Sequence, residues 1–307
     1  MLSTFPQKTS RNPSVNPANH QDTYAGLEDD EDIRKPTRFI ACVRTPESAE
    51  RLRKELANLQ HSPLVTILQG ENARAVQAAD IVLLGCQPQD LAACIGEPGV
   101  KNALQRKLLV SILAGVTIPQ IQEVLDQVTL SRVSAKVNGA KAPTETAHLT
   151  SIVRAMPNTA SLVRSSTTVI TSCSNTTPAD NRLVEWLFTA IGTVIHIAAA
   201  KFDACTALCG STPAFFALFL ESLLGGAVAL GLKRSEAQVM VAQTMKGAAL
   251  LMLAGQKPED IREAVATPGG STIQGLLALE RQGLRGLVAD ALIRCTAAAS
   301  ILGDKQA

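Results

Sequence analysis

Short apolar runs alternate with amphipathic segments between residues 38 and 198. The helices predicted between these runs begin near Pro46, Asn72, Ile118 and Pro178, and one more follows Pro88. Continuous apolar strands that alternate with helices are typical of a parallel sheet covered on both faces. The predicted strands are Phe39–Val43, Val65–Leu68, Asp80–Cys86, Leu108–Leu113 and Ile152–Ala155, with edge strands at Thr167–Thr171 and Val194–Ile197.

Beyond residue 198 the periodicity is helical throughout. The most apolar stretch, Phe215 to Leu232, contains Glu221 and glycines at 225, 226 and 231. A membrane-spanning helix needs about 20 apolar residues without such interruptions, so we predict a buried helix and no contact with a membrane. The predicted helices cover 201–209, 213–231, 235–254, 258–266, 272–282 and 284–302, with several breaks at Gly or Pro.

The predicted domain organisation has three parts. Residues 1–37 are rich in Pro, Asn, Ser and Thr and then acidic, which predicts a flexible tail. Residues 38–198 form an α/β domain, within which the polar stretch 134–150 predicts an irregular insertion. Residues 199–307 form an all-α domain.

Composition excludes several classes of function. The chain has 307 residues, 46% of them hydrophobic, and a net charge of +2, which creates no field that attracts nucleic acid. An aromatic content of 3% argues against base-stacking surfaces. The seven cysteines form no CxxC pair and the four histidines are scattered, so we expect reduced thiols and neither a disulfide framework nor a metal site. These features predict a cytoplasmic protein.

The carboxyl ends of the predicted strands are the first candidate binding site. Ligands bind at this edge of an open parallel sheet, and small residues and prolines there let a ligand approach the backbone. Arg44 directly follows a strand, where a cation suits the 2′-phosphate of NADP, although a solvated surface arginine fits the same pattern. The segments at this edge are Val43–Pro46, Gly85–Pro88, Ile112–Gly115 and Arg154–Thr159.

The segment Thr267–Gly275 is the second candidate site. Gly269 and Gly270 run into hydroxyl residues that would cap an apolar helix. Free backbone amides and the helix dipole make such a helix start suitable for a carboxylate or a phosphate. An ordinary turn between two helices is the alternative.

Cys205 and Cys209 share one helix face with no base nearby, so we assign them to the core.

The segment Pro258–Glu280 fits the pattern of one known family position by position, and Val153–Thr159 and Asp203–Ser211 fit the same pattern. Through these segments residues 38–303 resemble the pyrroline-5-carboxylate reductases, and their start is most similar to the fungal branch. The resemblance implies a Rossmann-like α/β domain followed by a helical dimerisation domain that interlocks two chains in a homodimer or larger homo-oligomer. It also implies hydride transfer from NADPH, with NADH as the alternative, to 1-pyrroline-5-carboxylate, giving L-proline in the last step of proline biosynthesis.

The resemblance implies roles for individual residues. Arg44 and Thr45 hold the adenosine phosphate, and Asn72 lies on the adenosine side. Backbone amides grip the substrate carboxylate, and the Thr272 hydroxyl meets the ring nitrogen as the catalytic group. This chemistry depends on orientation and needs neither a nucleophile nor a metal. The residues implied at the nicotinamide half are Gln87, Pro88, Ala114, Gly115, Met156, Pro157 and Asn158, and those at the substrate are Thr267, Gly269, Gly270, Ser271 and Thr272.

The first strand, Gly-rich turn and helix of the family pattern are missing. Residues 1–37 contain a single glycine, Gly26, and no apolar run of strand length. The missing unit would supply a central strand and the helix start that holds the pyrophosphate. We therefore expect unpaired strand edges and weak NADPH binding by this chain. Smaller departures are Gln87 in place of a lysine, Thr212 in place of a glycine and Ala199 in place of an acid.

Two explanations of different class remain open. The chain is either a reductase of this family in a truncated or mis-spliced form, or a catalytically impaired paralogue that acts as a subunit of an oligomer. A third reading, another enzyme of the β-hydroxyacid dehydrogenase type, is disfavoured by the segment Pro258–Glu280.

Overall fold

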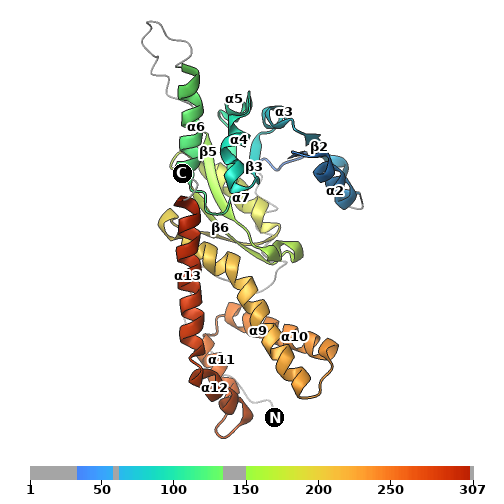
Figure 1. Cartoon of the computed structure of the whole chain (residues 1–307), viewed down its shortest axis with the longest axis vertical. Helices are drawn as coiled ribbons and strands as arrows, with labels where there is room; N and C mark the ends of the chain where they lie inside the picture. Colours follow the sequence, from blue (N-terminus) through green and yellow to red (C-terminus); the bar gives the residue numbers. More distant parts are fainter. Residues whose placement is uncertain (1–32, 58–61, 134–149, 305–307) are drawn as a thin grey trace. The chain divides into compact units, whose positions relative to one another are not determined.

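The computed structural model describes residues 33–57, 62–133 and 150–304 (Figure 1). The described residues of Asp30–Pro213 and Ala289–Ala307 form one compact unit, and Ala214–Val288 form another. Most of the predicted tail and nearly all of the predicted insertion lie outside the described residues, and 33–37 hold no helix or strand. The predicted domain limits at 38, 198 and 199 stay a prediction.

The α/β unit contains two separate sheets. Strands β3 (Ile81–Leu84), β4 (Leu108–Ser111), β5 (Ser151–Met156), β6 (Ser166–Ser172) and β7 (Gly192–His196) form a five-stranded sheet in that order. Strands β1 (Phe39–Val43) and β2 (Val65–Gln69) form a parallel pair of their own. Within the five-stranded sheet, β3, β4 and β5 are parallel, as the alternating pattern predicts.

The antiparallel pairing of β5 with β6 was not predicted. Residues Val153 to Met156 pair in reverse order with Val169 to Ser172, and β7 then runs parallel to β6. A parallel connection needs a dozen or more residues, and residues 157–165 are too few. They instead form the short 3₁₀ turn η3 (Thr159–Val163), which reverses the chain.

Strands β1 and β3 expose more of their apolar side chains to solvent than the interior strand β4 does. All four residues of β4 are buried, whereas Phe39 in β1 is 46% exposed and Leu83 in β3 is 57% exposed. Both strands nevertheless have the continuous apolar sequence of a strand covered on both faces. Among the described strands, β1 pairs only with β2 and β3 only with β4. The unpaired edges expected from the sequence are therefore confirmed for the described residues.

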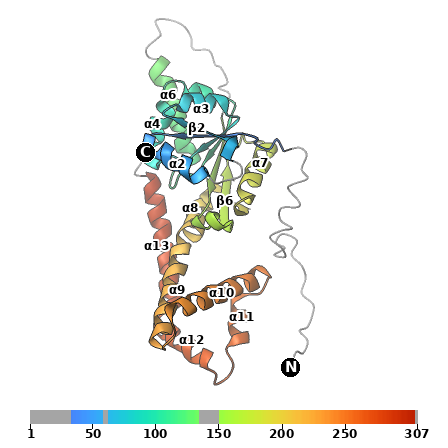
Figure 2. The ribbon, with the colours of Figure 1, turned by 90° about the vertical axis from the view of Figure 1, so that its right-hand side faces the viewer.

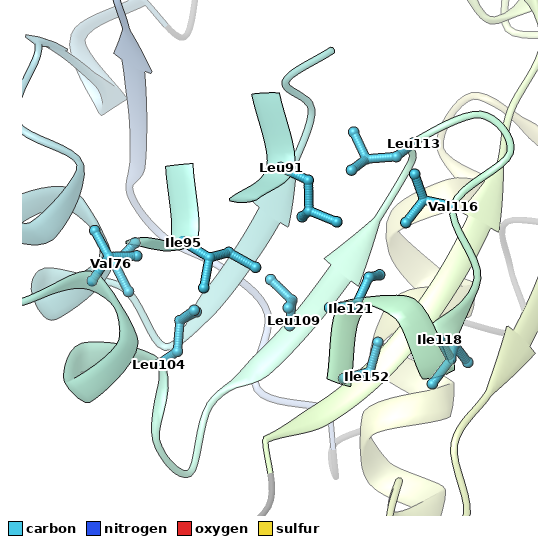
Figure 3. Close-up of a cluster of buried hydrophobic side chains, with 11 residues drawn as sticks. Val76, Leu91, Ile95, Leu104, Leu109, Leu113, Val116, Ile118, Ile121 and Ile152 are labelled. Carbon is cyan, nitrogen blue, oxygen red and sulfur yellow. The ribbon is translucent and has the colours of Figure 1, made fainter. Parts of the chain in front are cut away.

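Helices cover both faces of the five-stranded sheet. One apolar core joins β4 and β5 to the helices on the first face, including Leu91 and Ile121 (Figure 3). A second core places Val184 and Phe188 against Val110 and Val153 on the other face. The helices of this unit are α2 (Pro46–Leu56), α3 (Asn72–Ala78), α4 (Leu91–Gly96), α5 (Val100–Leu104), α6 (Ile118–Val133) and α7 (Pro178–Thr189).

Two predicted helices have different bounds in the structure. Helix α6 continues to Val133 rather than ending near Leu125, because no Gly or Pro interrupts the following residues. The predicted helix 201–209 is instead η4 (Ala199–Lys201), then α8 (Phe202–Cys205), then a π-helical segment η5 (Thr206–Ser211). Such π turns occur mostly as short insertions near functional positions.

The helices of the second unit are splayed rather than stacked side by side (Figure 2). Large apolar side chains such as Leu218, Leu230 and Val239 are exposed. The helical run Ala199–Ala229 is long and apolar enough to cross a membrane, and only 6% of its apolar window is buried, so the predicted buried helix is wrong for the single chain. The remaining helices are α9 (Thr212–Ala229), α10 (Arg234–Leu253), α11 (Pro258–Val265), α12 (Ser271–Arg281) and α13 (Leu284–Asp304).

Candidate functional site

The carboxyl end of β1 places Arg44 and Thr45 beside the loop that follows β3. Arg44 Nη1 lies 3.8 Å from Asp90 Oδ2, and the Arg44 side chain is 83% exposed. Thr45 caps α2, because its hydroxyl accepts a hydrogen bond from the Ser48 amide at 3.2 Å. The exposed guanidinium is free to turn toward a phosphate, since exposed pairs of this kind contribute little stability.

Two further predicted residues lie on the same side of the unit. Asn72 begins α3 and donates from Nδ2 to Glu97 Oε1 at 2.7 Å. Gln87 precedes the 3₁₀ turn η2 (Pro88–Asp90) that follows β3. Burial raises the pKa of the neighbouring Cys86 thiol to about 12, with a further contribution from Cys94. Cys86 therefore remains a protonated thiol at neutral pH and is no nucleophile.

The loop after β4 brings backbone rather than side chains to this edge. Ser111 Oγ accepts a hydrogen bond from the Leu113 amide at 3.4 Å. Ala114 and Gly115 follow, and Gly115 adopts a positive φ of 74° that a side chain would strain. A flat ligand can approach the chain closely at such a turn.

The turn after β5 is held by several hydrogen bonds. Asn158 Oδ1 accepts from the Ala160 amide at 3.0 Å, and the Asn158 amide donates to Ser166 Oγ at 3.0 Å. Asn158 Nδ2 donates to the Cys209 carbonyl at 2.9 Å. Met156 is buried against Phe202, next to Cys209. The turn Met156–Asn158 is thus fixed to the chain that leads into α9.

The predicted substrate loop joins α11 to α12 in the helical unit. Gly269 has a φ of 70°, and the Gly270 amide donates to the Thr267 carbonyl at 3.0 Å. Gly270 is the N-cap residue of α12 and offers no side-chain cap. The first amides of this helix, at Ser271 and Thr272, are therefore available to an anion.

Arg154 and Asp203, to which the sequence analysis gave no role of their own, lie beside the turn after β5. Arg154 in β5 is only 3% exposed, and Asp203 in α8 lies 3.9 Å from its Nη1 atom. An arginine inside the apolar strand Ser151–Met156 was the available signal, because a buried charge is rare without a partner. Cys205 and Cys209 pack beside Met156 and Phe202, in agreement with their assignment to the core.

Comparison with known proteins decides the family. Residues 199–302 match the model for pyrroline-5-carboxylate reductase dimerisation, and residues 25–115 match the model for the coenzyme F420-dependent NADP oxidoreductases. A pyrroline-5-carboxylate reductase of Lophium arboricola is 48% identical over 286 residues, which cover 92% of this chain and 85% of the relative. The reductase of Neurospora crassa is 42% identical, with 87% and 81% covered. The chain belongs to the pyrroline-5-carboxylate reductase family.

Solved reductases of this family share the fold. The Plasmodium falciparum pyrroline carboxylate reductase with NADP bound superimposes with a TM-score of 0.69 at 23% identity, covering 88% of this chain and 99% of that one. The Coxiella burnetii pyrroline-5-carboxylate reductase gives a TM-score of 0.67 at 26% identity, with 87% and 99% covered. The expected Rossmann-like domain followed by a helical dimerisation domain is confirmed.

The described residues of this reductase fit one half of a dinucleotide better than the other. The ends of β3, β4 and β5 supply prolines, Gly115 and a fixed Asn158, which suit a flat nicotinamide ring. The pyrophosphate side lacks a counterpart in the described part of the chain, because neither β1 nor β3 leads through a Gly-rich turn into a helix.

Proposed function

We propose that this chain is a cytoplasmic pyrroline-5-carboxylate reductase that forms L-proline with NADPH. The observation that carries the proposal is the uncapped start of α12 behind the positive-φ residue Gly269, in a chain of this family. A helix start with free amides is suited to a small carboxylate. The ends of the parallel strands support a nicotinamide site in the same protein.

The reaction adds a hydride and a proton across the C=N bond of 1-pyrroline-5-carboxylate. NADPH supplies the hydride when it is bound. The amides of Ser271 and Thr272 hold the substrate carboxylate. The ring nitrogen, which takes its proton from water before hydride transfer, hydrogen-bonds the Thr272 hydroxyl. The turn Met156–Asn158 orients the nicotinamide side. Orientation of this kind lowers the barrier by removing the entropy cost of bringing the reactants together.

The assay for this function is consumption of NADPH by the purified 307-residue chain with 1-pyrroline-5-carboxylate, together with detection of proline. The Neurospora crassa relative serves as the positive control. Proline formation above the protein-free rate is expected. No proline from this chain, in an assay in which the relative is active, would refute the proposed activity.

The helical unit supports a homodimer as the working form. Many large apolar side chains of this unit are exposed, among them Leu218, Leu230 and Val239, which is unusual for an isolated monomer, and this region matches a dimerisation model. Glu221 in the middle of α9 is exposed as well, which suits a protein partner better than a lipid core. We infer that a second copy of the chain covers this surface.

Leu218→Glu is expected to convert the dimer to a monomer at micromolar concentration, because it places a charge in the proposed interface. Light scattering after size exclusion measures the mass. The matched control is Leu162→Glu, at an exposed leucine of the α/β unit that is expected to leave the mass unchanged. A dimeric Leu218→Glu variant would contradict the proposed interface.

An assembly subunit with impaired cofactor binding is the second candidate function. The unpaired edges of β1 and β3 favour it, because the interrupted sheet coincides with the missing pyrophosphate turn. We expect the 307-residue chain to bind NADPH roughly 100-fold more weakly than the Neurospora crassa relative does. A change of this size is expected when two or more hydrogen bonds to a charged group are lost. Titration by NADPH fluorescence measures both, and a low-micromolar dissociation constant for this chain contradicts the expectation.

A further inference from the structure

Among the residues whose side chains are described, Arg154 is the only charged residue that is buried. It stands in β5, opposite Ser111 of β4 and Thr171 of β6, which are also buried. Side chains in register on neighbouring strands point to the same face, so these residues form a polar row across the sheet. Met156, two residues on, lies on the same face and belongs to the turn assigned to the nicotinamide.

The Arg154 guanidinium has two described partners, both from α8. Its central carbon lies 4.0 Å from the centre of the Phe202 ring, and Nη1 lies 3.9 Å from Asp203 Oδ1. Nε and Nη2 are buried and have no hydrogen-bond partner among the described residues. Burial lowers the pKa of Arg154 and Asp203 opposes that shift, so the charged form is kept at a cost in solvation.

Asp203 also connects to the C-terminal helix. Ser300 Oγ of α13 donates to Asp203 Oδ2 at 3.2 Å. The carboxylate therefore joins β5, α8 and the last helix at one point. A second connection runs close by, because Asn158 Nδ2 donates to the Cys209 carbonyl in η5. Both connections join the end of β5 to the segment Phe202–Ser211.

Stability alone does not account for this arrangement. Arg154 is buried, whereas the side chain of Asp203 is 36% exposed. An ion pair that buries a charge is often no more stabilising than apolar side chains of the same size, because desolvation offsets the attraction. Phe202 and Met156 already supply apolar packing at this position. What the pair adds is a fixed geometry, since a planar guanidinium stacked on a ring and facing a carboxylate has one preferred orientation.

We infer that Arg154 is a positioning residue, which holds the turn Met156–Asn158 in a fixed place against α8 and η5. The inference rests on the proposed function, because that turn is assigned to the nicotinamide. Arg154 itself touches neither substrate nor cofactor in this scheme. Its effect is transmitted through β5 on one side and through Asp203 and Phe202 on the other.

The test compares Arg154→Met, Arg154→Lys and Asp203→Asn in the full chain, with Arg74→Met as an exposed control in α3. Methionine keeps an unbranched stem out to the position of Nε and removes the charged guanidinium, so the melting temperature is expected to stay within a few degrees of wild type. Turnover by Arg154→Met is expected to fall roughly 10- to 100-fold, as for a misplacement of about 1 Å. KM for the pyrroline carboxylate is expected to stay within about two-fold of the wild-type value, since the residues that bind the substrate in its ground state are unchanged.

Hydrogen exchange provides a readout that does not need activity. In the wild type the Ala160 amide donates a hydrogen bond to Asn158 Oδ1, and the Ser161 amide donates one to the Asn158 carbonyl. In Arg154→Met and Asp203→Asn, these amides and those of residues 206–211 are expected to exchange faster than in the wild type, while the amides of α7 exchange at the wild-type rate. In Arg154→Lys, part of the wild-type protection against exchange is expected to remain. Unchanged exchange, faster exchange across the whole unit, or unchanged turnover in Arg154→Met would each overturn the inference. An inactive wild-type chain would refute the proposed function alone, and the exchange data would still decide the role of Arg154.

Discussion

Gly192→Ala is expected to lower the free energy of unfolding of the α/β unit by roughly 2–5 kcal/mol, through backbone strain and overpacking together. Gly192 begins β7 and pairs with Ser166 at the start of β6. A Cβ at this position would lie 2.0 Å from the Ser166 carbonyl oxygen and 2.4 Å from its nitrogen, and the residue has a φ of 152°. Both groups belong to the backbone, so no side-chain rotation can relieve the contact.

Urea unfolding followed by circular dichroism measures this loss as a lower midpoint. Recovery of the variant only in the insoluble fraction is the extreme form of the same result. Gly96→Ala is the matched control, because an added Cβ there meets nothing within 4 Å and the residue lies in α4. The control is expected to be neutral or slightly stabilising. A Gly192→Ala midpoint equal to that of wild type would show that the β6–β7 pairing differs from the one described.

Thr272→Val is expected to reduce kcat/KM for pyrroline-5-carboxylate by roughly 100-fold, the usual effect of removing one hydrogen bond made to the reacting group. Thr272 is the second residue of α12, directly after the uncapped start of that helix. Valine has a similar volume and the same branching at Cβ, so the helix and its packing are expected to remain intact. The change therefore isolates the hydroxyl.

Steady-state rates and the melting temperature are measured together for this variant. Thr244→Val is the control, an exposed threonine of α10 whose hydroxyl donates to the Met240 carbonyl at 2.8 Å. Its kcat/KM is expected to stay within about two-fold of wild type, and Thr272→Ser is expected to retain most of the activity. Unchanged kcat/KM in Thr272→Val, in an active preparation, would remove Thr272 from the reaction.

Local sequence patterns were sufficient for most of the helices and strands. Runs such as Leu108–Val110 contain the apolar content of a strand buried on both faces, and Thr177 with Asp180 forms the capping box that begins α7. Such signals depend on residues within about four positions of each other, so they can be recognised without knowledge of the tertiary contacts. The antiparallel turn of β6 was missed because strand direction depends on the length of the connection and on the sheet that receives it.

The candidate site was predictable in part for the same reason. The ends of parallel strands meet at one edge, so the segments that contain Gln87 and Met156 could be expected to lie together without a structure, whereas Arg44 ends β1 of the separate pair. The roles of these residues toward a dinucleotide stay a prediction. The contacts of Arg154 with Phe202 and Asp203 could not, because no local pattern indicates which distant segment covers a strand face. The same holds for the hydrogen bond from Asn158 to the Cys209 carbonyl.

By itself the sequence indicated the family through a resemblance, and it also determined the alternation of strands and helices and the segment that starts α12. The alternation and the helix start follow from residue type and short-range spacing. Tertiary structure alone decided the separation of β1–β2 from the other five strands, the exposed apolar surface of α9 and α10, and the buried charge at Arg154. Each of these depends on which surfaces meet after the chain has folded, since burial and strand pairing are properties of contacts between residues far apart in sequence.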